Sequence, residues 1–276
     1  MIRNLDNSNL YFPQDERISF QEEGHIYLLD GKRQLTPVSS VYSKYFKPFD
    51  TDKWADHKAR TMPITAEQLK EQWKCNGMMA SFAGTHLHKQ IEDFLNGAKN
   101  MEPMCHFTFN GTYIHEAKNI YIDKEIENFQ RFVKEVDFTP FRTEWRVFDE
   151  ELGIAGTIDL ICSRNDSTFE FYDWKRSKSL IDVDGNVCNN NKYGIGGING
   201  LEHIPDCNYA HYALQQNLYK YIVEKCYDLK ISAMHLVVLH PDYPCYKVIE
   251  VPSLNKEIQL IIHDLIHDLK NVIMEY

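Results

Sequence analysis

The sequence predicts an α/β protein, because runs with the two-residue period of a strand and segments with the spacing of an amphipathic helix occur in one chain. Two runs rich in β-branched and aromatic residues, 157–162 and 169–174, flank the polar turn cluster 164–167. They predict an antiparallel hairpin. The strongest helical patterns cover residues 81–95 and 209–223.

The other elements follow from the same two periods, taken in chain order. Residues 17–29 predict an N-terminal β-hairpin, because two short apolar runs precede Asp30-Gly31. Further helices are expected from about Ser39 and over residues 66–73, 122–136 and 255–274, and further strands over residues 231–240 and 246–251. The apolar stripe of the last helix predicts a buried face.

The 157–174 hairpin places two acidic side chains opposite each other. If its turn is centred near Asp166, opposing residues have numbers that sum to about 332, so Asp159 faces Asp173 at roughly 5 Å. Lys175 points to the same side as Asp173, while Trp174 points to the other. Two carboxylates this close favour a shared divalent cation, and oxygen ligands suit Mg²⁺ or Mn²⁺.

The same residues allow a plainer interpretation. Asp159 and Asp173 can be surface acids of an ordinary hairpin, and the run 175–178 can be a solvated basic segment. A third acid, Glu144, lies on the predicted strand 143–148 of the same sheet. Its alternative role is a surface salt bridge.

Two helices add polar groups to this set. In the 81–95 helix, His88 and Glu92 are four residues apart and share a face, although a histidine at such a place is often structural. In the 209–223 helix, Gln215 and Tyr219 have the same spacing beside the apolar face. A core helix with polar edges would give the same pattern.

The order of these pieces is specific. They are, along the chain, Gly84-Thr85-x-x-His88, Glu144, Gly156-Thr157-Ile158-Asp159, Asp173-x-Lys175 and Gln215-x-x-x-Tyr219. This order resembles the PD-(D/E)XK nuclease superfamily, in the branch of the RecB nuclease domain and the mitochondrial genome maintenance exonuclease. The resemblance covers residues from about 18 to about 240, including the Ser/Thr-rich segment 35–40.

The resemblance implies a fold and a set of roles. The fold is a restriction-endonuclease-like core, with a mixed central β-sheet flanked by helices, an N-terminal β-hairpin and helical additions. One or two Mg²⁺ or Mn²⁺ ions would be held by His88, Asp159, Asp173 and the backbone carbonyl of Trp174, with Glu144 binding directly or through water. Lys175 would be catalytic, together with Asp159, Asp173 and Glu144. Gln215 and Tyr219 would contact DNA or brace the active-site strands, and Arg176 and Lys178, which lie beside the site, are expected to contact DNA. Ile158 stands where the family usually has proline.

The function that the resemblance implies is Mg²⁺-dependent hydrolysis of DNA, leaving a 3′-hydroxyl and a 5′-phosphate. We expect an exonuclease that acts on single-stranded or end-processed DNA in replication, recombination or repair, similar to nucleases of phages and large DNA viruses. One alternative is a structure-specific or restriction-type endonuclease. Another is a catalytically silent DNA-binding or assembly protein on a nuclease fold, against which the joint presence of Asp159, Asp173 and Lys175 speaks.

The composition sets limits on this expectation. The 276 residues, 43% of them hydrophobic, are enough to bury a large core without disulfides. The net charge of −10 opposes DNA binding, so we expect a local basic groove near Lys175, and a replication or recombination partner that delivers DNA. Seven scattered cysteines without a Cys-x-x-Cys pair predict a reduced compartment and no iron–sulfur cluster.

The chain organisation is predicted as one nuclease domain over residues 1–276. Residues 1–80 would supply the hairpin and helices, and residues 81–276 the core, with a loop insertion at 179–208 that is either a flap over the substrate or a surface loop. Residues 1–6 show neither signal-peptide nor transit-peptide character, and no apolar run predicts a membrane span. We therefore expect a cytoplasmic protein, or a nuclear one in a eukaryotic host.

Overall fold

The structure, a computed structural model, describes residues 12–274, so the predicted absence of a targeting signal at residues 1–6 lies outside it. The chain forms two compact units. Among the described residues, the first comprises 12–47, Val136–Val238 and 247–274, and the second comprises Pro48–Glu135 and Leu239–Tyr246. The fold is α/β with a mixed central sheet flanked by helices, which confirms the predicted class at this level.

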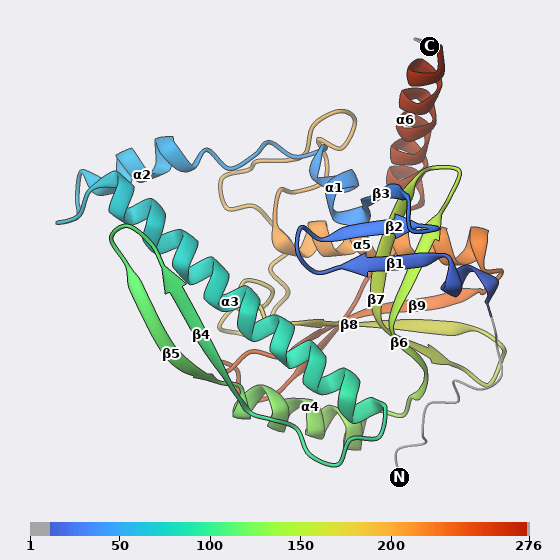
Figure 1. The fold of residues 1–276 in the computed structure, drawn as a ribbon, viewed down its shortest axis with the longest axis horizontal. Coiled ribbons are helices and arrows are strands. Elements are labelled where there is room, and N and C mark those ends of the chain that lie inside the picture. Colours follow the sequence, from blue (N-terminus) through green and yellow to red (C-terminus); the bar gives the residue numbers. More distant parts are fainter. Residues whose placement is uncertain (1–11, 275–276) are drawn as a thin grey trace. The chain divides into compact units, whose positions relative to one another are not determined.

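The sheet of the first unit contains eight strands (Figure 1). They are β1 (Ile18–Gln21), β2 (Ile26–Leu29), β3 (Arg33–Pro37), β6 (Thr139–Asp149), β7 (Ile154–Ser163), β8 (Phe169–Lys175), β9 (Ile231–Val238) and β10 (Lys247–Glu250). Their order is β1-β2-β3-β7-β8-β9-β10, and β6 pairs with β7. The β3–β7 and β8–β9 pairs are parallel and the others antiparallel, so the sheet is mixed.

The central strands β7 and β8 are buried over almost their whole length. Near-continuous apolar sequence is what a strand covered on both faces requires. Their antiparallel register pairs Leu160 with Tyr172 and Ile161 with Phe171, which confirms the predicted sum of 332. The turn also falls where it was predicted, between Ser163 and Phe169. Continued by one residue beyond Leu160 and Tyr172, this register sets Asp159 opposite Asp173.

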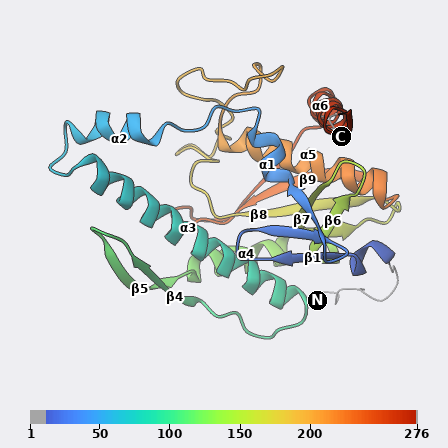
Figure 2. The same cartoon turned by 45° about the horizontal axis from the view of Figure 1, so that its top comes forward.

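The described part of the first unit contains three α-helices, α1 (Val38–Ser43), α5 (Asn208–Cys226) and α6 (Asn255–Met274), and one short 3-10 helix, η1 (Pro13–Glu16). Helix α5 packs against β6 and β9, and α1 lies next to it (Figure 2). The strands predicted near residues 231–240 and 246–251 and the last two helices are confirmed. The fully buried stripe predicted for the last helix is wrong, because Ile266 is 40% exposed beyond the buried residues Ile258, Ile261 and Ile262. The side chain of Ile273 lies outside the described residues.

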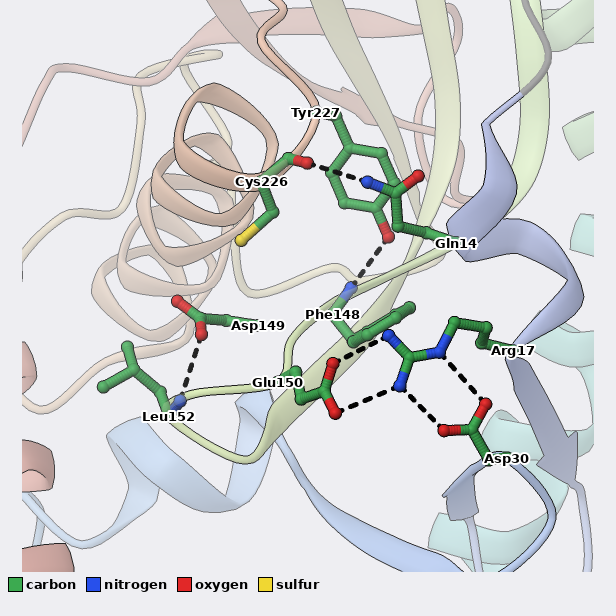
Figure 3. Close-up of polar contacts among 9 residues, drawn as sticks. All are labelled: Gln14, Arg17, Asp30, Phe148, Asp149, Glu150, Leu152, Cys226 and Tyr227. Atoms are coloured by element: carbon green, nitrogen blue, oxygen red, sulfur yellow. Dashed lines mark hydrogen bonds and ion pairs between the residues drawn. The ribbon is translucent and has the colours of Figure 1, made fainter.

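A polar clamp fixes the N-terminal strands to the turn between β6 and β7 (Figure 3). The Arg17 guanidinium donates to the carboxylates of Asp30 and Glu150, each at 2.7 Å. Nearby, the Tyr227 hydroxyl accepts a hydrogen bond from the Phe148 N–H at 3.2 Å. These contacts hold the start of β7, the strand that carries Asp159.

The predicted loop 179–208 contains no helix or strand before α5 begins at Asn208, only the bridges Ile181↔Val187 and Gly196↔Pro205. Its ends are nevertheless anchored, since Leu180 and Leu201 are buried. Such packing counts against a flap that comprises the whole segment. Exposed residues concentrate between its ends, where Val183 and Tyr193 face solvent.

The second unit contains α2 (Thr51–Ala59), α3 (Ala66–Leu95), β4 (Met104–Asn110), β5 (His115–Tyr121) and α4 (Asp123–Glu135). The helix expected from about Ser39 is confirmed as α1, whereas α2, which follows Pro48 with Asp50 as its N-cap, had no counterpart among the predicted helices. One prediction is corrected here. The helices expected over 66–73 and 81–95 are one helix of 30 residues. Gly77 does not interrupt it, because a glycine costs only about 1 kcal/mol in a helix and packing along α3 outweighs this.

Glu71 ties α3 to the β4–β5 turn. Its carboxylate accepts hydrogen bonds from the backbone N–H groups of Thr112, Tyr113 and Ile114 at 3.1, 2.8 and 2.7 Å. Burial of the carboxylate opposes ionisation, but these three donors outweigh it and lower the pKa of Glu71. The contact therefore favours the folded unit at neutral pH and is lost as pH falls through that lowered pKa.

We expect Glu71→Gln to expose this turn. Hydrogen exchange of the amides of residues 112–114, followed by mass spectrometry at neutral pH, should be faster in the variant. The difference from the wild type should vanish in acid, below the lowered pKa of Glu71. Glu67→Gln, one turn earlier on the same helix, is the control. Equal protection of the turn in the wild type and Glu71→Gln at neutral pH would contradict the role of this contact.

In the described part of the chain, no helix combines the length and the apolar character that crossing a membrane requires.

Candidate active site

Two buried acids lie on adjacent strands at the centre of the first unit's sheet. Asp159 on β7 is 8% exposed and Asp173 on β8 is 3% exposed. The N–H of Trp174 donates to Asp159 Oδ2 at 2.8 Å, which fixes this carboxylate against the neighbouring strand. Burying acids in strands this apolar is costly unless they are paired or bind a cation. Buried acids at such a position are therefore candidates for a functional site.

Lys175 supplies the positive charge of the site. Its Nζ lies 2.5 Å from Asp173 Oδ2. Burial alone lowers the pKa of Lys175, but the carboxylates of Asp173 and Asp159 outweigh it and raise the pKa above its usual value. These carboxylates therefore favour the ammonium form of Lys175, which donates hydrogen bonds.

A chain of polar contacts links this ammonium to α5. Lys175 Nζ donates to Gln215 Oε1 at 3.5 Å, and Gln215 Nε2 donates to the Tyr219 hydroxyl at 3.2 Å. Tyr219 is 5% exposed, and burial raises the pKa of its phenol well above the usual value. The predicted pair on the 209–223 helix therefore braces the lysine from the adjacent helix.

Gly156 makes this bracing sterically feasible. A Cβ at position 156 would lie 2.2 Å from Cε1 of Tyr219. The backbone of Gly156 does not need a left-handed conformation, so its role is close approach. The Tyr219 ring rests directly on β7 three residues before Asp159.

Glu144 occupies an irregular point of β6. Polar and apolar residues alternate there as in a regular strand. Glu144 nevertheless has φ +43°, which is rare for a residue other than glycine. The register passes from Thr143↔Leu160 to Trp145↔Ile158 around it. One Glu144 carboxylate oxygen lies within 4.8 Å of one from Asp159. Strained residues of this kind concentrate at functional sites.

Tyr212 is a residue at this site that the sequence patterns did not single out. Lys175 Nζ lies 4.3 Å from the centre of its ring, which is a cation–π contact. Tyr42 on α1 is close enough for Lys175, Tyr212 and Asp173 to act on its pKa, which burial raises. The signal for Tyr212 was present, because it precedes Gln215 by one helical turn and so shares its face. Tyr42 lies far from these residues in the sequence, and no sequence pattern pointed to it.

The other predicted site residues lie at various places. Arg176 is half-buried and Lys178 exposed, directly after β8. The N–H of Trp174 bonds to Asp159, and its carbonyl as a metal ligand stays a prediction. His88 is half-buried on α3 of the second unit, in the helical turn between the buried residues Leu87 and Ile91. On that helix, Glu92 is ion-paired with Lys89 at 3.3 Å.

The charges of the first unit's site suit a divalent cation. When ionised, Asp159, Asp173 and Glu144 carry three negative charges against the single ammonium of Lys175. Carboxylate oxygens are the ligands that Mg²⁺ and Mn²⁺ prefer, and each carboxylate has about four lone-pair positions, so one hydrogen bond does not exhaust it. The donor set therefore fits the metal that the sequence predicts.

Comparison with models of known families gave no match, and comparison with curated proteins gave none. Among solved structures, the crystal structure of SSO0001 is similar to this chain at 13% sequence identity, over 84% of this chain and 74% of that one, with a TM-score of 0.32.

Proposed function

We propose that this chain is a Mg²⁺-dependent deoxyribonuclease with a restriction-endonuclease-like core, related to the RecB branch of the PD-(D/E)XK superfamily. The observation that supports it most is the group of the buried acids Asp159 and Asp173 with the half-buried Lys175, on the adjacent strands β7 and β8 and braced by Gln215. Carboxylates that can hold a metal ion, beside a fixed ammonium, can stabilise the charge that develops in phosphodiester hydrolysis. The N-terminal β1–β2 hairpin is, in this proposal, an addition to that core.

Each residue of the site has a separate role in the proposed reaction. Asp159, held by the Trp174 N–H, and Asp173, held by Lys175, present fixed carboxylates without reorganisation. The Lys175 ammonium lies where it can donate to a phosphate oxygen or to the attacking water. Gln215 and Tyr219 hold that ammonium in place from α5.

Mg²⁺ or Mn²⁺ would be held by Asp159 and Asp173, with Glu144 completing the set directly or through water, and would supply charge neutralisation and a more acidic bound water. The roles of His88 and of the Trp174 carbonyl as further ligands are proposed from the sequence resemblance. Arg176 and Lys178 are proposed as DNA contacts. Since the net charge is −10, delivery of DNA by a replication or recombination protein is part of the proposal.

We propose an exonuclease, and the test compares DNA ends with closed circles. Purified protein is incubated with end-labelled linear DNA, single-stranded and duplex, and with covalently closed DNA, in Mg²⁺, Mn²⁺ or EDTA. Progressive loss of linear DNA in the metal ions, with closed circles intact, is the expected result. Nicking of the circles would instead indicate an endonuclease. Inertness of both the wild type and Lys175→Ala under all conditions would refute the enzyme and leave a silent DNA-binding protein.

A further inference from the structure

The second unit carries an exposed aromatic cluster that the proposed active site does not use. We define the aromatic platform as Phe49, Trp54 and Trp73, brought together by the packing of α2 on α3. Phe49 is 65% exposed, the largest exposure among the phenylalanines and tryptophans of the described residues. Trp54 and Trp73 are half-buried. A large ring left in water beside two others marks a contact surface more than a packing need.

The rings are arranged to receive a flat partner. Phe49 and Trp54 are nearly parallel, with 6° between their planes and 6.4 Å between their centres. Trp73 stands at 64° to Phe49, with the centres 6.2 Å apart, and forms an edge of the cluster. Stacking on such faces is tolerant of sequence, because every nucleic-acid base has a π-face.

The charges around the rings favour an anionic partner. Lys58 Nζ lies 5.6 Å from the centre of the Trp73 ring. Lys53, Arg60 and Lys74 take part in no ion pair among the residues that the structure describes. Of the nearby acids, Asp50 caps α2 by accepting from the Lys53 N–H, Asp52 is paired with Lys70, and Glu71 is bonded to the β4–β5 turn. Asp56 and Glu67 remain, and both act on Lys70. Formal charges on α2 and the start of α3 therefore balance in a chain of net charge −10, and the cations without an ion pair outnumber these two acids.

From these observations we infer that the aromatic platform binds single-stranded nucleic acid, with bases stacked on Phe49 and Trp54 and the phosphates attracted by the surrounding lysines. Stripes of aromatic rings among basic residues are the general means of binding single strands without sequence preference. The choice of a nucleic acid as ligand rests on the proposed function, which it deepens by naming a single strand as the substrate. The platform itself involves no hydrolysis.

The test is binding of a fluorescein-labelled oligothymidylate about 16 nucleotides long, in EDTA, measured by anisotropy. Phe49→Ala should weaken binding roughly fivefold to 150-fold, the usual effect of removing one stacking ring, and Phe49→Trp should retain it. Phe49 is exposed, so the variant should fold, which circular dichroism verifies. Tyr121→Ala, which removes a ring that is 61% exposed on β5 of the same unit, is the matched control and should bind as the wild type does.

A second readout locates the contact. The oligonucleotide should quench the fluorescence of Trp54 and Trp73. For Phe49→Ala, the oligonucleotide concentration that gives half of the quenching should rise by the same factor as the loss of affinity. Raising the salt concentration should weaken wild-type binding, as release of counterions from phosphates requires.

Undiminished binding by Phe49→Ala, or no binding by the wild type, would overturn the inference, and the platform would then be assigned to another class of partner. Neither result bears on hydrolysis, which is measured separately in Mg²⁺. Conversely, a platform that binds DNA in a protein that hydrolyses none would uphold this inference while refuting the proposed function.

Discussion

Lys175→Met is expected to abolish DNA hydrolysis and to destabilise the first unit. The substitution removes an ammonium that contacts Asp173 directly, at a place where the Lys175 side chain is 14% exposed and that of Asp173 4%. Breaking one partner of a buried ion pair costs about 3–5 kcal/mol of folding free energy. Loss of one fixed donor to a developing charge costs about 10²–10³ in rate. Chemical denaturation and single-turnover hydrolysis measure the two effects.

A paired variant separates these effects. In Lys175→Met with Asp173→Asn, neither charge is left, so most of the folding free energy should return while hydrolysis stays absent. Rates of hydrolysis are compared well below the unfolding temperature of each variant. Unfolding then does not contribute to a lower rate. A Lys175→Met protein that cuts DNA at the wild-type rate would remove Lys175 from the mechanism.

Gly156→Ala is expected to have the second largest effect, although it adds a single methyl group. The new Cβ would overlap the Tyr219 ring at 2.2 Å, and both are buried, so the ring must move. Overpacking of this kind costs about 1–3 kcal/mol. Displacement of Tyr219 also breaks its contact with Gln215, which braces Lys175, so we expect the rate of hydrolysis to fall as well.

The cause can be checked in a double-mutant cycle. With Tyr219→Ala as background, Gly156→Ala should cost much less, because the overlapping ring is gone. Gly77→Ala on α3 is the control, since nothing lies within 4 Å of its added Cβ, and it should stabilise the protein slightly. Additive costs for Gly156 and Tyr219 would show that the close approach is not what requires glycine at position 156.

The parts of the fold that local patterns determine were predictable. The register of β7 and β8 followed from a turn near Asp166 and a two-residue period, and Asp159 and Asp173 lie on these two adjacent strands as expected. The bounds of the last helix also agree with its apolar spacing. In contrast, α2 was missed, because its apolar pattern is weak and its start depends on the cap at Asp50.

Features created by tertiary packing were not predictable from spacing. The fit of Tyr219 against Gly156 and the left-handed backbone of Glu144 depend on how α5 and β6 meet β7. The meeting of Phe49 with Trp73 depends on α2 folding back on α3. Periodicity describes which face of one element is buried, and it contains no information about which residue of another element lies against it.

The central claim is that Asp159, Asp173 and Lys175 form a metal-dependent site for cutting DNA. The most direct measurement is single-turnover hydrolysis of a labelled single strand in Mg²⁺ and in EDTA by the wild type and by Asp159→Asn. Asparagine retains an acceptor for the Trp174 N–H while removing the charge that a cation needs. The account predicts hydrolysis by the wild type in Mg²⁺ alone and none by Asp159→Asn. Equal hydrolysis by both proteins, or hydrolysis that EDTA does not stop, would contradict it.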